Sequence, residues 1–145
     1  MPIPSINYAN RPVDPEVMAV INKYAGKRVL DFGCGGGAYA YALSGQHEVR
    51  GVDIQEYPAW AANRAMFDIC KGLPLPFADH SFDTVICLQT LEHLSQPDEV
   101  LNEFKRVTSG NLILTVPNCD ISEGMEISRL TFFHWIDRSH VNFYD

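Results

Sequence analysis

The stretch VLDFGCGGGAYAYAL, from Val29 to Leu43, decides the fold class of this chain. An apolar run typical of a buried strand is followed by four glycines within the five residues 33–37, and then by a run typical of a helix. Glycine permits left-handed backbone angles and lets a ligand approach the main chain closely. A glycine-rich turn between a strand and a helix is typical of sheets that bind nucleotides. We therefore predict that this turn binds a nucleotide-like ligand.

The rest of the chain alternates between strand-like and helix-like segments. Apolar runs predict strands over 27–32, 47–54, 64–69, 82–88 and 111–118. Helices are expected from Asp14-Pro15 to Gly26, over 38–45 and over 97–107, whereas 55–63 favours one or two loose turns and 70–81 a loop. Near-continuous apolar strands separated by helices indicate a doubly wound α/β fold with a mostly parallel sheet, in which ligands bind at the carboxyl ends of the strands.

Composition limits the classes of function. The chain has 145 residues, a formal net charge of −7 and no apolar stretch long enough for a membrane span. This charge argues against nonspecific binding to nucleic acid or to an anionic membrane, so neither is expected as a partner. Four separated cysteines without a CxxC pair and the lack of a signal peptide favour the cytoplasm. By length the chain is a single domain, residues 1–145, with an extended arm over about 1–13.

Two carboxylates at strand ends limit the class of ligand that the turn can bind. Asp53 ends the second strand, where it can accept hydrogen bonds from a ribose diol or act as an ordinary turn aspartate. Asp31 precedes the glycines and suits a cationic ligand better than a pyrophosphate. However, Gly33, Gly35 and Ala38 also satisfy a loose dinucleotide fingerprint, so an NAD(P)-dependent oxidoreductase stays open as an alternative.

The span from Arg28 to Pro117 contains LPFADHSFD and LEH in addition to the glycine turn. With these motifs it resembles the class I S-adenosylmethionine-dependent methyltransferases that act on small molecules. The resemblance implies that S-adenosylmethionine is the cofactor. It places the turn Gly33, Gly35, Gly37 under the methionine part and Asp31 at the ammonium group. It further implies that Asp53 holds the ribose hydroxyls and that Ile54 packs on the adenine. Asp68 would accept from the adenine amino group, and the backbone of Ile69 would contact the ring. Leu88 and Gln89 would close the other side of the cofactor site.

Two histidines are candidate general bases for a hydroxyl acceptor. His93 follows Glu92 in LEHL, and His140 lies in DRSHVNFYD. A neutral histidine near pH 7 can take the proton from an alcohol, so O-methylation of a small molecule is the expected reaction. The alternative is that Glu92, His93 and His140 hold a divalent metal, but Gln89 stands where related metal-binding patterns have an acidic residue, so no metal is assigned.

The sheet of this family usually has seven strands, with a C-terminal hairpin beyond the fifth. We expect the chain to lack these C-terminal strands, either as a segment of a longer enzyme or as a minimal version. The fifth strand would then be a sheet edge able to pair with a second copy in a homodimer. A non-catalytic cofactor-binding subunit is therefore a third reading beside the methyltransferase and the oxidoreductase.

Overall fold

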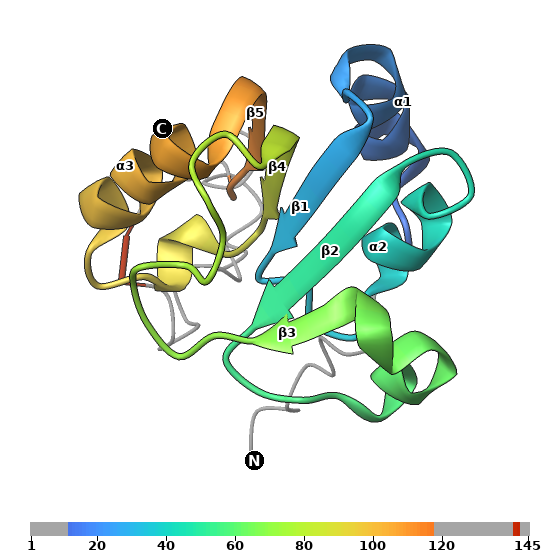
Figure 1. Ribbon diagram of the computed structural model, residues 1–145, viewed down its shortest axis with the longest axis horizontal. Helices are drawn as coiled ribbons and strands as arrows, with labels where there is room; N and C mark the ends of the chain where they lie inside the picture. Colours follow the sequence, from blue (N-terminus) through green and yellow to red (C-terminus); the bar gives the residue numbers. More distant parts are fainter. Residues whose placement is uncertain (1–11, 118–140, 143–145) are drawn as a thin grey trace, which may run out of the picture.

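The computed structural model describes residues 12–117 and 141–142, which form one sheet flanked by helices (Figure 1). Five parallel strands lie in the order β3-β2-β1-β4-β5. The strands are β1 Arg28–Phe32, β2 Glu48–Asp53, β3 Phe67–Ile69, β4 Phe82–Leu88 and β5 Thr108–Thr115. The helices are α1 Pro15–Tyr24, α2 Ala38–Leu43 and α3 Pro97–Val107, with 3-10 segments η2 Pro58–Met66 and η3 Leu91–His93. The doubly wound α/β prediction is confirmed.

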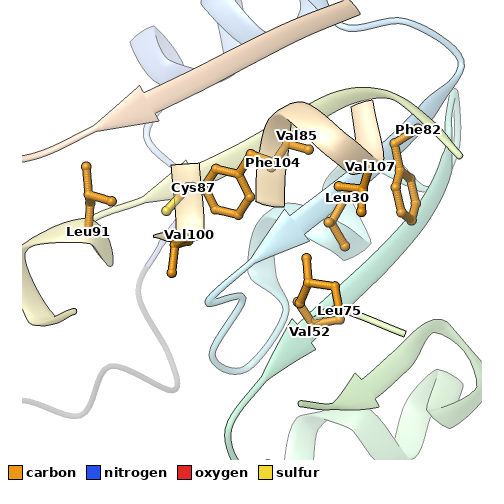
Figure 2. Close-up of a cluster of buried hydrophobic side chains, with 10 residues drawn as sticks. All are labelled: Leu30, Val52, Leu75, Phe82, Val85, Cys87, Leu91, Val100, Phe104 and Val107. Atoms are coloured by element: carbon orange, nitrogen blue, oxygen red, sulfur yellow. The ribbon is translucent and has the colours of Figure 1, made fainter. Parts of the chain in front are cut away.

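Both faces of the central strands β1 and β4 are buried, which explains their continuous apolar runs. Leu30 of β1 packs on one face, in a cluster with Phe104 of α3 and Leu75 of the loop after β3; Figure 2 shows its ten side chains. Val29, the next residue to Leu30 along β1, packs on the other face with Ile21 of α1 and Trp60 of η2. Alternate residues of one strand therefore support two cores.

Local sequence signals set most of the element ends. Asp14 caps α1, because its side chain accepts hydrogen bonds from the N–H groups of Glu16 and Val17 at 2.8 and 3.3 Å. Helix α3 has Pro97 in its first turn, acidic residues at its start and basic residues at its end, as the helix dipole favours. The predicted ranges for β4 and α3 agree with the structure.

Two strands differ from the prediction. Residues 64–66 belong to η2, not to β3, and Arg64 donates to the carbonyl of Phe67 at 2.5 Å, at the point where the strand begins. Strand β5 begins at Thr108, three residues before the predicted 111, directly after α3. No residue separates α3 from β5, so the strand already begins at 108–110, where the apolar pattern is weak. The pattern of apolar residues therefore does not mark the start of this strand.

The order of the strands places the candidate site. From β1 the chain continues to β2 and β3 on one side of β1, and then crosses to β4 and β5 on its other side. The carboxyl ends of β1 and β4 therefore form the topological switch point, where ligands bind in sheets of this kind. The glycine turn lies there. None of the described helices is long and apolar enough to cross a membrane.

Candidate cofactor site

The glycine turn has a backbone that glycine alone adopts easily. Gly33, Gly35 and Gly37 all have positive φ angles, of 71°, 51° and 84°. The turn is tied to β2, because the N–H groups of Gly33 and Cys34 donate to the carbonyl of Val52 at 2.9 and 3.1 Å. The turn thus continues the sheet beyond the end of β1.

The space beside two of these glycines is taken by the protein's own side chains. A Cβ atom on Gly33 would lie 2.3 Å from Oγ1 of Thr90, which follows β4. A Cβ atom on Gly37 would lie 2.5 Å from the ring of Phe67 in β3. Because Gly33 and Gly37 have no side chains, Thr90 in the loop after β4 and the ring of Phe67 in β3 can pack against the turn.

The peptide groups of Gly35 are held from two sides. Asp53, at the end of β2, accepts a hydrogen bond from the Gly35 N–H on Oδ2 at 2.8 Å and one from the Ile54 N–H on Oδ1 at 2.7 Å. On the other side, the indole N–H of Trp60 donates to the Gly35 carbonyl at 2.8 Å. Asp53 therefore has the turn role considered from the sequence. Each of its oxygens retains a lone pair for a further donor such as a ribose hydroxyl.

Asp31 is a buried carboxylate whose Oδ2 atom has no hydrogen-bond partner within the described part of the chain. Burial raises its pKa to about 7; the nearby negative charge of Asp53 adds to the increase, and a hydrogen bond from the Ala40 backbone opposes it. A buried carboxylate without a partner is costly, and a bound cation would compensate it. Asp31 thus fits the ammonium group of an amino-acid ligand.

Apolar surface at the ends of β2 and β3 adjoins this polar centre. Ile54 and Ile69 are exposed by 66% and 42%, and Ile69 is paired with Asp53 in the register of β2 and β3. Exposed isoleucines beside the carboxylate of Asp53 suit a flat ring such as adenine. Asp68 is engaged differently, because it forms an ion pair with Arg50 of β2.

The end of β4 closes the switch point. Gln89 has a φ of 53°, which side-chain-bearing residues adopt rarely, and its N–H donates to the carbonyl of Thr115 at 2.8 Å. Thr90 donates to the carbonyl of Leu88 at 3.2 Å and contacts Gly33 as described above. Leu88 and Gln89 are thus adjacent to the glycine turn through Thr90.

The LEH motif forms η3, directly after this end of β4. Glu92 is 1% exposed and its Oε2 atom has no partner among the described residues, while its Oε1 lies 3.9 Å from Nε2 of His93. His93 is partly exposed. The motif therefore pairs a buried carboxylate with an accessible imidazole.

A segment near the C-terminus packs on η3. The N–H groups of Val141 and Asn142 donate to the carbonyl of Glu92 at 2.8 and 3.0 Å. The Asn142 side chain donates to the carbonyls of Leu91 and Leu94 at 3.2 and 2.6 Å. The other predicted base, His140, lies outside the described residues. Residues 118–140 and 143–145 lie outside them as well, so the expected lack of further strands stays a prediction.

Over residues 12–117 and 141–142, no three histidine, cysteine, aspartate or glutamate side chains are grouped so as to hold a metal. The metal alternative involves His140, which is not among them. Cys34, Cys70 and Cys87 are free thiols.

Two residues of this region were missed by the sequence analysis. Trp60 falls in the segment expected to form loose turns, and Asn142 follows the candidate His140 without a motif of its own. A lone tryptophan in a polar, proline-containing segment is the only signal that the sequence offers for Trp60.

Comparison with known proteins identifies the family of this chain. A family model described as a methyltransferase domain matches residues 30–116, which is more than half of the chain. Together with the fold, this match identifies the class I S-adenosylmethionine-dependent methyltransferases, whose cofactor is S-adenosylmethionine. This chain belongs to that methyltransferase domain family, and the oxidoreductase alternative is set aside.

Curated relatives share parts of their length with this chain. The uncharacterized protein MJ0638 of Methanocaldococcus jannaschii is 34% identical over 121 residues, covering 79% of this chain and 53% of that protein. The ubiquinone biosynthesis O-methyltransferase of Stutzerimonas stutzeri is 34% identical, covering 53% of this chain and 38% of the relative. The 27-O-demethylrifamycin SV methyltransferase of Amycolatopsis mediterranei is 33% identical, covering 57% and 35%. The chain thus spans about half or less of the length of these relatives.

Solved structures show the same fold. The YcgJ protein of Bacillus subtilis is 26% identical with a TM-score of 0.66, covering 88% of this chain and 61% of that one. A SAM-dependent methyltransferase of Thermotoga maritima, described as a possible histamine N-methyltransferase, is 27% identical with a TM-score of 0.60, covering 79% and 56%.

Proposed function

We propose that this protein binds S-adenosylmethionine at the switch point between β1 and β4 and transfers its methyl group to a hydroxyl oxygen of a small molecule. The observation that carries the proposal is the buried carboxylate of Asp31, with its unpartnered Oδ2 beside a glycine turn whose backbone is already fixed. The cofactor, when bound, supplies an activated methyl group and two positive charges. A site with buried negative charge fits such a ligand better than it fits a dinucleotide pyrophosphate.

Different residues of the chain would bind different parts of the cofactor. Asp31 would compensate the ammonium group, and the backbone of Gly33, Gly35 and Gly37 would lie along the amino-acid part. Asp53 would accept from the ribose hydroxyls while it keeps its bonds to the turn. This arrangement holds the reacting end in place, and alignment contributes much of the rate of a displacement reaction.

The adenine would lie against the exposed isoleucines at the ends of β2 and β3. We propose that Ile54 packs on the ring and that Ile69 contacts it through its backbone. Asp68 would accept from the adenine amino group with one oxygen while the other stays paired with Arg50. Leu88 and Gln89 would close the opposite side.

His93 is the proposed general base among the described residues. Oε1 of Glu92 lies 3.9 Å from its Nε2 atom, so a carboxylate adjoins the imidazole that would take the acceptor proton. His140 precedes Val141, whose N–H binds η3, and it is proposed as a second residue of the acceptor side. Support for oxygen as the methylated atom comes from relatives that are named O-methyltransferases.

We further propose a cytoplasmic protein whose partners are the small-molecule acceptor and a second copy of the chain, with no nucleic acid or membrane among them. Support for the second copy is that β5 is the last strand of the described sheet and exposes Leu112 and Leu114. Unpaired strand edges favour pairing with another chain.

The test separates cofactor binding from transfer. Calorimetric titration of the full chain with S-adenosylmethionine, S-adenosylhomocysteine and NAD should show binding of the first two alone. Transfer of labelled methyl is then measured to phenols, catechols and aliphatic alcohols, with amines as the comparison. Binding without transfer to any of them supports the non-catalytic subunit, and binding of NAD alone contradicts the proposal.

A further inference from the structure

We infer that Trp60 is a positioning residue of this site: its indole N–H fixes the Gly35 carbonyl, so that the glycine turn is preformed for the amino-acid end of the cofactor. The inference rests on the proposed function and adds to it a residue from outside the glycine motif. It starts from one contact, the 2.8 Å hydrogen bond from Trp60 Nε1 to the Gly35 oxygen.

This contact completes a pair that holds both polar groups of Gly35. Asp53 binds the Gly35 N–H at 2.8 Å from the end of β2, and Trp60 binds its carbonyl from η2. Gly35 has a φ of 51° and no side chain to anchor it. Two hydrogen bonds from different elements therefore restrict a residue that would otherwise sample many conformations.

Trp60 itself is held rigidly. It is completely buried, and its ring stacks on Phe67 with centroids 4.8 Å apart and an interplanar angle of 8°. The Arg64 guanidinium lies 5.4 Å from its ring centroid. The segment before it is also tied to α2, because the Tyr41 hydroxyl donates to the carbonyl of Ala59 at 2.6 Å.

The same aromatic stack supports the turn at a second point. The ring of Phe67 occupies the space beside Gly37, where a Cβ atom would lie 2.5 Å from it. Trp60 thus supports the turn directly through Gly35 and indirectly through Phe67 and Gly37. A segment that reads as loose turns in the sequence forms one wall of the glycine turn.

The expected consequence is specific to one end of the ligand. A preformed turn avoids the entropy cost of ordering glycines upon binding. If the Gly35 carbonyl loses its donor, the turn gains freedom where the amino-acid part binds, while the isoleucines at the adenine end are unchanged. A residue that only stabilises the fold would not distinguish the two ends.

The experiment compares Trp60→Phe with Tyr41→Phe, using S-adenosylhomocysteine and adenosine as probes. Tyr41→Phe is the matched control, because it removes a hydrogen bond between α2 and the η2 segment without touching Gly35. Trp60→Phe should weaken S-adenosylhomocysteine roughly tenfold, as expected for one hydrogen bond. Its affinity for adenosine should stay within about twofold, and Tyr41→Phe should change neither.

The outcomes distinguish this inference from the proposed function. A folded Trp60→Phe variant with unchanged affinity for S-adenosylhomocysteine, or with equal losses for both probes, overturns the inference alone. Wild-type protein that binds neither probe overturns the proposed function and the inference with it.

A second variant covers the case in which phenylalanine leaves too large a cavity for folding. Replacement of tryptophan by 3-benzothienylalanine keeps the bicyclic shape and substitutes sulfur for the N–H donor. The chain has two tryptophans, so the replacement is made in a Trp135→Phe background, with ordinary tryptophan in that background as the control. The same selective loss for S-adenosylhomocysteine is expected, and its absence contradicts the inference.

Discussion

At Asp31, the stability of the fold and the proposed binding of the cofactor oppose each other. Its pKa in the folded protein is raised from 3.8 to about 7, mainly by burial and further by Asp53. The folded state therefore binds a proton that the unfolded state has lost between pH 4 and 7. Stability from this group is complete below about pH 4 and falls as pH rises to about 7.

We predict that Asp31→Asn stabilises the ligand-free protein at pH 8, because it removes a buried charge whose Oδ2 atom has no partner among the described residues. The pKa difference corresponds to an upper limit of about 4 kcal/mol. Urea unfolding of both proteins at pH 5 and pH 8 measures this effect. The gain should be larger at pH 8, and an equal gain at both values would contradict the assigned pKa.

The same substitution should damage cofactor binding. Wild-type affinity for S-adenosylmethionine should increase with pH up to about 7 and then level off, since only the ionised Asp31 compensates a cation. Asp31→Asn should bind at least about tenfold more weakly and lose this pH dependence. Calorimetric titrations from pH 5.5 to 8.5 provide the measurement.

A further prediction concerns the contribution of Asp53 to cofactor binding. Asp53→Ala should weaken S-adenosylmethionine binding by about 1–3 kcal/mol, through loss of charge-assisted bonds. Because Asp53 also binds the turn through Gly35 and Ile54, affinity loss alone does not identify a ribose contact.

A comparison of adenosine with 2′-deoxyadenosine separates the two roles of Asp53. If Asp53 binds the ribose diol, wild-type protein prefers adenosine, and Asp53→Ala loses most of that preference. An undiminished preference in the variant would leave Asp53 as a turn residue only.

Among the elements, η3 depends on a contact from far along the chain. The two N–H bonds of Asn142 reach Leu91 and Leu94, which flank Glu92 and His93. Without them, the Leu94 carbonyl would lose its side-chain donor, and the Leu91 carbonyl would keep the Leu94 N–H, at 3.2 Å. The proposed base is therefore positioned by a segment near the C-terminus.

We predict that Asn142→Ala slows methyl transfer several-fold while the affinity for S-adenosylhomocysteine stays within about twofold. The unfolding free energy should fall by about 1–2 kcal/mol, as for lost buried hydrogen bonds. Hydrogen exchange should increase over 91–94. Asn142→Leu is the matched variant, since it has a similar shape without the donors and should behave alike. Weaker cofactor binding in both would show that the contact supports the cofactor site instead.

At the level of the whole molecule, β5 determines the expected assembly. It lies at one end of the described sheet, and Leu112 and Leu114 are each 37% exposed. We predict a concentration-dependent dimer in sedimentation velocity between about 1 and 100 μM, in the range of weak protein association. Leu112→Lys combined with Leu114→Lys should give a monomer, because charged side chains on an edge strand oppose pairing.

The corresponding double alanine variant is the control for lost apolar area. A wild-type chain that stays monomeric over the whole range would contradict pairing through β5. A dimer that persists in the lysine variant would place the interface elsewhere.

The amino-acid sequence by itself determined the parallel sheet, the start of α1, the range of α3 and the turn at the switch point. These features depend on residues that are close in the chain: near-continuous apolar runs, the Asp14-Pro15 cap and the glycines. The family followed from the order of such local motifs, and the match over residues 30–116 confirms it.

Only the tertiary structure decided what surrounds the turn. The bond from Trp60 to Gly35 spans 25 positions, and the bond from Asn142 to Leu91 spans 51. Thr90 fills the space beside Gly33 because two parallel strands end side by side, and Asp31 is buried with its Oδ2 atom unpartnered among the described residues. Such contacts arise from packing between distant segments. No periodicity or short motif within a single segment encodes them.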